Sequence, residues 1–238
     1  MKTIVFMGAP EKSHLLLTLG RLLTELGQKV LMVDSTTRQT MQAYLPEPEH
    51  RWTVSVTEFA HMDVAIGFMA YAQLDYYFQD REGGWPIYDV LLLDTDHSQF
   101  MNGQELAKAQ TRVWCSSFHR RELLHNVDLL QQLDLAAQPL SFYPLQIPFV
   151  PTTLSLDYIQ SLYASYPIQW QEPTFQLSEE ERDRSAILDN QHHGRIHVRH
   201  LSGSYVESVW GMASAWFNLE RRSIRAAWKQ MRRGDRRG

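Results

Sequence analysis

Lys12 and Ser13 are the first residues that could do chemistry, because they follow a short apolar run at residues 3–7 and open a leucine-rich segment. In a phosphate-binding loop, backbone N–H groups surround the phosphates, a lysine neutralises their charge and a hydroxyl binds Mg²⁺. Glycine lets such a loop pass close to the phosphates, and Gly8 stands at its start. Gly8, Lys12 and Ser13 are therefore candidate residues for binding a nucleotide.

Two aspartates are expected beside this loop. Asp34 follows the apolar run at residues 29–33, and Asp94 ends the run at residues 88–94, the clearest strand of the chain. Carboxyl ends of parallel strands meet at one edge of the sheet, where open α/β folds bind ligands. Asp34 and Asp94 thus join the candidate site. Asp94 would support Mg²⁺ if a nucleotide binds, and would otherwise be an acid at the edge of a vestigial site.

The elements that must position these residues alternate between strand and helix. Leucines within residues 12–26 recur at helical spacing, and Gly27 follows as a helix-ending glycine. Strand, loop, helix and strand within ~30 residues form a βαβ unit with a right-handed crossover. Because the alternation continues, the sequence predicts an α/β fold with a doubly wound, mainly parallel sheet flanked by helices.

Less regular patterns predict the remaining elements. Strands are expected at residues 51–56, 112–117 and 195–200, and a strand-like stretch at residues 140–150 is broken by prolines. Helices are expected at residues 120–133 and 178–189, in part of 62–78, and as one long helix from residue 204 to about 233. We expect one α/β domain over residues 1–219 and a basic helix end over residues 220–238.

Residues 1–135 resemble the MinD/ParA family of deviant P-loop ATPases. Three stretches carry the resemblance in the family's order and spacing: the loop Phe-Met-Gly-Ala-Pro-Glu-Lys-Ser at residues 6–13, the helix and strand at residues 22–34, and residues 88–96, which look like the family's Walker B strand. The resemblance implies a P-loop NTPase-like fold, ATP with Mg²⁺ as cofactor, and a dimer that sandwiches ATP.

The loop departs from the family pattern, which reads Gly-Lys-Gly-Gly-x-Gly-Lys-Thr/Ser. Phe6 replaces the first glycine, and Met7 replaces the signature lysine that in the family reaches the partner's nucleotide. Ala9 and Glu11 replace two further glycines, and Thr36 replaces the second acid of the family's Asp-x-Asp. A like charge ~4 Å from a phosphate costs about 4 kcal/mol at an effective dielectric of about 20, so Glu11 opposes nucleotide binding.

These departures leave three interpretations of the loop. The chain is a hydrolysing ATPase, a protein that binds nucleotide weakly without turnover, or a P-loop-derived fold that has lost nucleotide binding. We favour the third, in which the chain has no cofactor or binds ATP and Mg²⁺ only weakly. Glu11 could close the site by pairing with Lys12 or Arg38. His14, next to the loop, is expected to pack rather than to act as a base.

Charge is divided unevenly along the chain. The net charge is −4, but residues 221–238 contain eight Lys or Arg and one Asp, which gives +7 there and −11 over the first 220 residues. An apolar, Trp-bearing stripe beside basic positions is typical of an interfacial amphipathic helix, and its placement is similar to the membrane-targeting helix of MinD-like proteins. Nucleic acid phosphates are the second candidate. The candidate membrane- or anion-binding residues are Arg221, Arg222, Arg225, Trp228, Lys229, Arg232 and Arg233.

Two other features are expected to carry no chemistry: a histidine cluster, expected to be solvated polar residues, and the single cysteine. Four histidines at residues 192–200 could hold zinc, yet a strand at residues 195–200 would point His197 and His200 to opposite faces. Cys115 has no paired motif and is expected to be a buried thiol. We therefore predict no metal site and no catalytic residue.

Composition limits the function classes. One cysteine excludes an internal disulfide framework, and no apolar run approaches ~18 residues, so we expect a cytoplasmic protein without a membrane-spanning helix. We interpret the chain as a localisation factor or scaffold rather than an enzyme, peripheral at the inner face of the membrane. It would serve an assembly such as a pilus or secretion machine, since family members of the TadZ/CpaE type have atypical P-loops.

The expected partners are proteins of that machine and an anionic membrane surface, with a homodimer left open and nucleic acid ranked below lipid. The rival interpretation is an active ATPase that positions a complex or partitions DNA. A related tyrosine kinase of the exopolysaccharide type is disfavoured because the C-terminal region has no tyrosine cluster.

Overall fold

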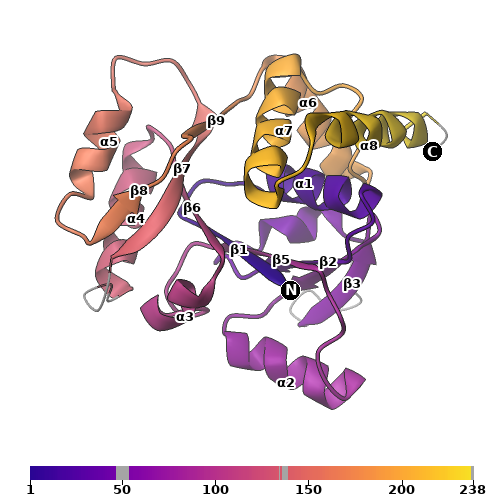
Figure 1. Ribbon diagram of the computed structural model, residues 1–238, viewed down its shortest axis with the longest axis horizontal. Coiled ribbons are helices and arrows are strands. Elements are labelled where there is room, and N and C mark those ends of the chain that lie inside the picture. Colours follow the sequence, from indigo (N-terminus) through magenta and orange to yellow (C-terminus); the bar gives the residue numbers. More distant parts are fainter. Residues whose placement is uncertain (47–53, 134, 136–138, 237–238) are drawn as a thin grey trace.

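The computed structural model describes residues 1–46, 54–133, 135 and 139–236, which build a helix-flanked sheet (Figure 1). The strands lie in the order β3-β4-β2-β5-β1-β6-β7-β8, and β9 also pairs with β7. Every strand pair is parallel except β3 with β4. The strands are β1 Lys2–Met7, β2 Val30–Asp34, β3 Ser55–Phe59, β4 Met62–Ile66, β5 Val90–Thr95, β6 Thr111–Ser116, β7 Leu140–Phe149, β8 Ile168–Trp170 and β9 Phe175–Ser178.

Helices cover both faces of this sheet, which confirms the predicted α/β fold (Figure 1). Successive strand residues face opposite sides. Ile4 and Phe6 of β1 therefore join one core with α1, α7 and α8, whereas Val5 and Met7 join another with α2, α3 and α4. The helices are α1 Ser13–Glu25, the 3-10 helix η1 Thr40–Tyr44, α2 Tyr71–Glu82, α3 Gly103–Lys108, α4 Arg120–Gln132, α5 Leu156–Leu162, α6 Glu181–His192, α7 Gly203–Phe217 and α8 Arg221–Gly234.

The long C-terminal helix that the sequence predicts is two helices. Asn218 ends α7 with a left-handed φ of 51°, a conformation that asparagine tolerates better than most residues, and α8 starts at Arg221. The turn between them folds α8 back onto the molecule, so that Ile224, Trp228 and Met231 join the core that contains α1. The predicted boundary at residue 219 falls in this turn. In the described part of the chain, no helix is long and apolar enough to cross a bilayer.

Residues 195–200 are not the predicted strand. The backbone N–H and C=O of His197 both bond to the side chain of Asn190, at 2.9 Å each, so this residue has no backbone groups left for a sheet. Gly194 starts the segment with a left-handed φ of 56°. Asn190 of α6 thus holds the segment as a loop, so that His197 and His200 are not placed on opposite faces of a strand.

One other expectation needs correction, and two more are met only in part. β7 runs unbroken through Pro144 and Pro148, because it pairs with β8 at residues 140–142 and with β9 at residues 145–149, and Pro144 lies where one neighbour replaces the other. The helix expected in part of residues 62–78 is present as α2, which begins at Tyr71, whereas residues 62–66 form β4. A turn with positive φ at Ala60 and His61 joins β4 to β3. Of the strand predicted at 51–56, residues 51–53 lie outside the described residues.

Candidate functional site

The five residues predicted for a nucleotide site lie together at the carboxyl edge of the sheet. β2, β5 and β1 are neighbours, and their register pairs Asp34 with Asp94. Gly8 follows β1, Lys12 precedes α1 and Ser13 begins it. The parallel arrangement therefore gathers the predicted residues, and their contacts decide what they can bind.

Gly8 lets the loop turn tightly against β6. Its φ is +133°, and a Cβ atom at this position would lie 2.2 Å from the carbonyl oxygen of Cys115. Both the backbone conformation and the space therefore require glycine.

Most backbone N–H groups of a phosphate loop would point at the phosphates, but several here have other partners or are missing. Ala9 N donates to Oδ1 of Asn126 at 2.8 Å, and Asn126 Nδ2 donates to the carbonyl of Cys115 at 2.9 Å. Pro10 has no N–H at all. Ser13 N donates to the Glu11 carboxylate at 2.7 Å. The loop thus presents few free donors to an anion.

Lys12 is folded back, and its ammonium group contacts three oxygens within the chain. Nζ donates to the carbonyl oxygens of Gly8 at 2.9 Å and Pro10 at 3.2 Å, and it lies 2.6 Å from the Asp94 carboxylate. The Lys12 ammonium is thus held by oxygens of its own chain, and these contacts would have to break before it could bind a phosphate.

The charges of this pair are tightly coupled in the interior. Burial acts to lower the pKa of Lys12, but the Asp94 charge together with weaker neighbours outweighs it and raises that pKa above its ordinary value. Burial raises the pKa of Asp94, and the Lys12 ammonium opposes this shift. Since Lys12 Nζ donates to two carbonyl oxygens and lies 2.6 Å from Asp94, we take the pair as ammonium and carboxylate.

Glu11 lies at the N-terminus of α1, where a bound phosphate would lie in a working loop. Besides Ser13 N, its carboxylate accepts from Oγ1 of Thr40 at 3.3 Å. A negative group is stabilised at a helix N-terminus by the free N–H groups and the helix dipole. The ion pairs that we expected for Glu11 with Lys12 or Arg38 are not formed. Glu11 closes the site by occupying the anion position itself.

The remaining groups of the site are likewise satisfied from within the chain. Ser13 Oγ lies 2.6 Å from Thr40 Oγ1, so the hydroxyl expected to bind Mg²⁺ is hydrogen-bonded to another hydroxyl. Asp34 accepts from Thr36 N, Thr36 Oγ1 and Met41 N at 2.6–2.9 Å. Burial raises the pKa of Asp34, and these hydrogen bonds oppose the rise.

Little space remains between these side chains. The cavity lined by the loop, Thr36, Arg38, Asp94 and Asp96 measures about 20 Å³, which is room for roughly one water molecule. The residues present therefore do not fit a nucleoside triphosphate in this conformation.

His14 links the start of α1 to distant parts of the chain. Asn190 Nδ2 lies 3.1 Å from Nε2, and the Tyr205 hydroxyl lies 2.8 Å from Nδ1. An amide nitrogen only donates, so Nε2 accepts and Nδ1 carries the proton. Burial lowers the pKa of His14 to about 3. His14 packs in the interior, as predicted, but it lies in the first turn of α1 and its ring is hydrogen-bonded to Asn190 and Tyr205.

The basic side chains of α8 lie outside, whereas its apolar face is buried. Trp228 is 3% exposed, which corrects its prediction as a membrane contact. The other predicted residues, Arg221, Arg222, Arg225, Lys229, Arg232 and Arg233, are exposed. A groove of about 560 Å³ lies along α8, lined by Trp210, Arg225, Trp228, Lys229, Arg232, Arg233 and Arg236 and by no acidic residue. Arg225 lies over the Trp210 ring at 5.6 Å.

The remaining candidates from the sequence are the histidines at residues 192–200 and Cys115. Within the described residues, no group of three His, Cys, Asp or Glu side chains is arranged to hold a metal ion. Cys115 is buried, and burial raises its pKa to about 12, so it is not a reactive thiol at neutral pH.

Sequence reasoning missed the residues that close the loop and tie α1 to the C-terminal helices. Their types carry no signal for these roles, because each lies far along the chain from its partner. They are Thr40, Asn126, Asn190 and Tyr205.

Comparison with known proteins identifies the fold. No protein-family model and no curated protein sequence matches the chain. Among solved structures, a chain of the MinC:MinD cell division protein complex of Aquifex aeolicus superposes with a TM-score of 0.61 at 13% identity, covering 92% of this chain and 97% of that one. A ParA family ATPase from Chlorobium tepidum TLS superposes with a TM-score of 0.60 at 12% identity, covering 89% of this chain and 98% of that one. A putative plasmid partition protein from Borrelia burgdorferi B31, bound to AMPPNP, superposes with a TM-score of 0.52 at 10% identity, covering 97% of this chain and 99% of that one.

Proposed function

Because the chain has the fold of the MinD and ParA ATPases, we propose that it acts as a non-hydrolysing scaffold or localisation factor for a membrane-associated assembly, such as a pilus or secretion machine. The observation that carries this proposal is the state of Lys12, whose ammonium group donates to two carbonyl oxygens and forms a buried ion pair with Asp94. The phosphate loop retains its fold, but oxygens of the chain itself contact the groups that would otherwise bind phosphate.

Nucleotide binding would have to undo these contacts. Removing one partner from a buried ion pair costs roughly 3–5 kcal/mol, and Lys12 would have to leave Asp94 to reach a phosphate. Glu11 would also have to leave the N-terminus of α1, or repel the incoming phosphate. Since ~1.4 kcal/mol is a factor of ten in affinity, these costs together support weak binding of ATP and Mg²⁺ at most.

We place the contact with an anionic membrane on the exposed basic side of α8. Each basic residue near an anionic leaflet contributes ~1 kcal/mol, and six exposed basic residues of α8 were predicted for this role. The apolar face of α8 packs on the core, so the contact is electrostatic and leaves the helix lying along the surface. The protein would then be cytoplasmic and peripheral at the inner face of the membrane.

Protein partners and a homodimer complete the proposal. The MinC:MinD complex is an example in which a chain of this fold assembles with a second protein. With Met7 in place of the family's signature lysine, a dimer of this chain would not depend on a shared nucleotide.

Thermal melting with and without Mg-ATP tests the closed loop. The unmodified chain should show no change in Tm in millimolar Mg-ATP, and a clear rise would refute the proposal. Glu11→Gly removes the carboxylate that occupies the anion position and should raise the response to Mg-ATP. Glu11→Gln is the matched control, because it removes the charge and keeps an oxygen that can accept from Ser13 N.

Co-sedimentation with anionic vesicles tests the membrane contact. The double variant R232Q/R233Q should bind vesicles more weakly, whereas R120Q/R121Q removes an equally adjacent, exposed arginine pair from α4 and should bind like the unmodified chain. Equal binding of all three would refute the role of α8. A truncation at residue 219 is unsuitable, because it would uncover the core beneath α8.

An active ATPase that positions a complex or partitions DNA is the second candidate. It is favoured by the gathering of Gly8, Lys12, Ser13, Asp34 and Asp94 at one edge of the sheet, and by the AMPPNP-bound protein of the same fold. This candidate would be established if the unmodified chain releases phosphate from ATP and the Lys12→Ala variant does not.

A further inference from the structure

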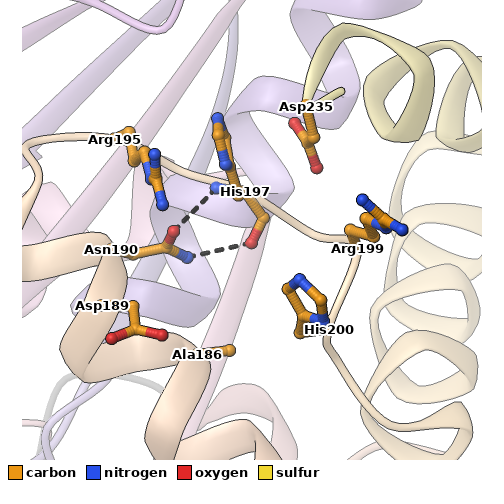
Figure 2. A pocket seen from close by; sticks show the side chains of 8 residues that line it. All are labelled: Ala186, Asp189, Asn190, Arg195, His197, Arg199, His200 and Asp235. Atoms are coloured by element: carbon orange, nitrogen blue, oxygen red, sulfur yellow. Dashed lines mark hydrogen bonds between the residues drawn. The ribbon is translucent and has the colours of Figure 1, made fainter. Parts of the chain in front are cut away.

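A cup of about 160 Å³ lies between α6, the loop at residues 195–200 and the end of α8, apart from the phosphate loop (Figure 2). It collects charged side chains from three segments that are distant in the sequence. Its lining is Ala186, Asp189, Asn190, Arg195, His197, Arg199, His200 and Asp235. The failed strand prediction had separated His197 from His200, whereas the loop brings both to one cup.

The loop that carries the basic residues is held in place before any ligand arrives. Asn190 donates to the carbonyl of His197 and accepts from its N–H, both at 2.9 Å (Figure 2). Arg182 donates to the carbonyls of His200 and Leu201 at 3.0 Å. Preorganised donors bind more tightly, because less ordering is needed on binding.

The negative charge of Asp235 is already used. One of its oxygens lies 2.8 Å from Arg21 Nη1, and the other accepts from the N–H of Val198 at 2.7 Å. Its side chain is 1% exposed. Asp235 therefore fixes the wall of the cup without adding an uncompensated charge to it.

The basic side chains of the cup, in contrast, have no polar partner among the residues that the structure describes. Arg195, His197, Arg199 and His200 make no side-chain hydrogen bond or ion pair with any residue that the structure describes. The Nε of Arg195 is buried without a partner, which is costly for a charged donor. Asp189 is exposed and forms no ion pair with either arginine.

We infer that this cup binds a phosphate-class oxyanion, either inorganic phosphate or the phosphoryl group of a small phosphomonoester. Guanidinium groups donate two parallel hydrogen bonds to phosphate oxygens, and Arg195 and Arg199 lie on different sides of the cup, with the two histidines between them (Figure 2). Pockets for larger ligands measure roughly 300–1,000 Å³, so a cup of 160 Å³ suits the phosphoryl group rather than a whole nucleotide.

Isothermal titration of the full chain with inorganic phosphate, and separately with glycerol 1-phosphate, tests this site in a phosphate-free buffer. We expect saturable binding of at least one of them. Arg195→Gln and Arg199→Gln should each weaken it about tenfold, because each removes a charge-assisted hydrogen bond. Tighter binding of the ester would assign the site to a phosphomonoester, and tighter binding of phosphate would assign it to the free ion.

Three controls keep the result decisive. Arg121→Gln removes one exposed arginine of α4 and should bind like the unmodified chain. Arg232→Gln alters the basic groove of α8, and Glu11→Gly alters the phosphate loop. If binding is absent, or depends on Arg232 or Glu11 but not on Arg195 and Arg199, the inference is overturned. Neither Arg195 nor Arg199 holds another described residue through its side chain, so both variants should keep the Tm of the unmodified chain.

The ring of His197 gives a second, independent readout. Burial lowers its pKa, Asp235 raises it, and Arg195, Arg21 and His200 lower it; Arg199 and Asp189 also line the cup. A bound dianion should raise the pKa of His197, measured by proton NMR with the signal identified by its loss in His197→Gln. An unchanged pKa at a saturating concentration of phosphate or ester would show that the ion is bound elsewhere.

Discussion

Acid should destabilise this protein through His14, and the size of the effect follows from its surroundings. His14 accepts a hydrogen bond from the Asn190 amide at Nε2, and burial lowers its pKa to about 3. An unfolded histidine has a pKa of about 6.5. Between these two values the unfolded chain takes up a proton that the folded chain excludes, so stability is lost as the pH falls from about 6.5 towards 3.

The loss can be worked out for one pH interval. Between pH 7.5 and 5.0 the unfolded imidazole becomes almost fully protonated while the folded one stays neutral, which amounts to about 2 kcal/mol of unfolding free energy at ~1.36 kcal/mol per pH unit. His14→Gln cannot titrate at this position. Its loss over the same interval should therefore be about 2 kcal/mol smaller than that of the unmodified chain.

Urea unfolding at both pH values measures this difference, because all other titrating groups are common to the two proteins. Asn190→Asp is a further probe, since a carboxylate facing Nε2 favours a protonated ring and should raise the pKa of His14. If the unmodified chain and His14→Gln lose equal stability between pH 7.5 and 5.0, His14 is already protonated or solvated in the folded state, and the reasoning fails.

Three further variants test other contacts. Gly8→Ala places a Cβ atom 2.2 Å from the Cys115 carbonyl at a φ of +133°, and we expect a loss of at least ~3 kcal/mol in urea unfolding. Lys12→Met leaves Asp94 buried without its cation and should cost ~3–5 kcal/mol, whereas the double variant with Asp94→Leu should recover most of this loss in thermal melting. Arg21→Gln removes the bonds to Asp235 and to the end of α8, so amide exchange in the last turn of α8 should accelerate without global unfolding; unchanged exchange would contradict that anchoring role.

The framework of the fold could be predicted because its signals are local. The apolar runs that became β1, β2 and β5 and the leucine spacing of α1 depend only on neighbouring residues. Once the strands are parallel, geometry brings Asp34 and Asp94 to one edge. Those predictions needed no knowledge of distant contacts.

The state of the loop could not be predicted, because it depends on partners that are distant in the sequence. Nothing in a single sequence pairs Ala9 with Asn126, or Ser13 with Thr40. The helix break rests on the conformation of Asn218, which lies within an otherwise helical pattern. The loop at residues 195–200 exists because Asn190 takes both backbone groups of His197, and this contact overrides the local strand preference.

The packing of α8 and α7 against α1 has a consequence for synthesis. The leucines of α1 are synthesised well before the helices that cover one of their sides, because those helices span residues 203–234. The contacts of α1 with α7 and α8 close a very long loop, and such contacts form slowly. While the chain is still on the ribosome, α1 has an uncovered apolar flank that chaperones or non-native contacts can occupy. The growing polypeptide cannot complete this core until α8 has left the exit tunnel.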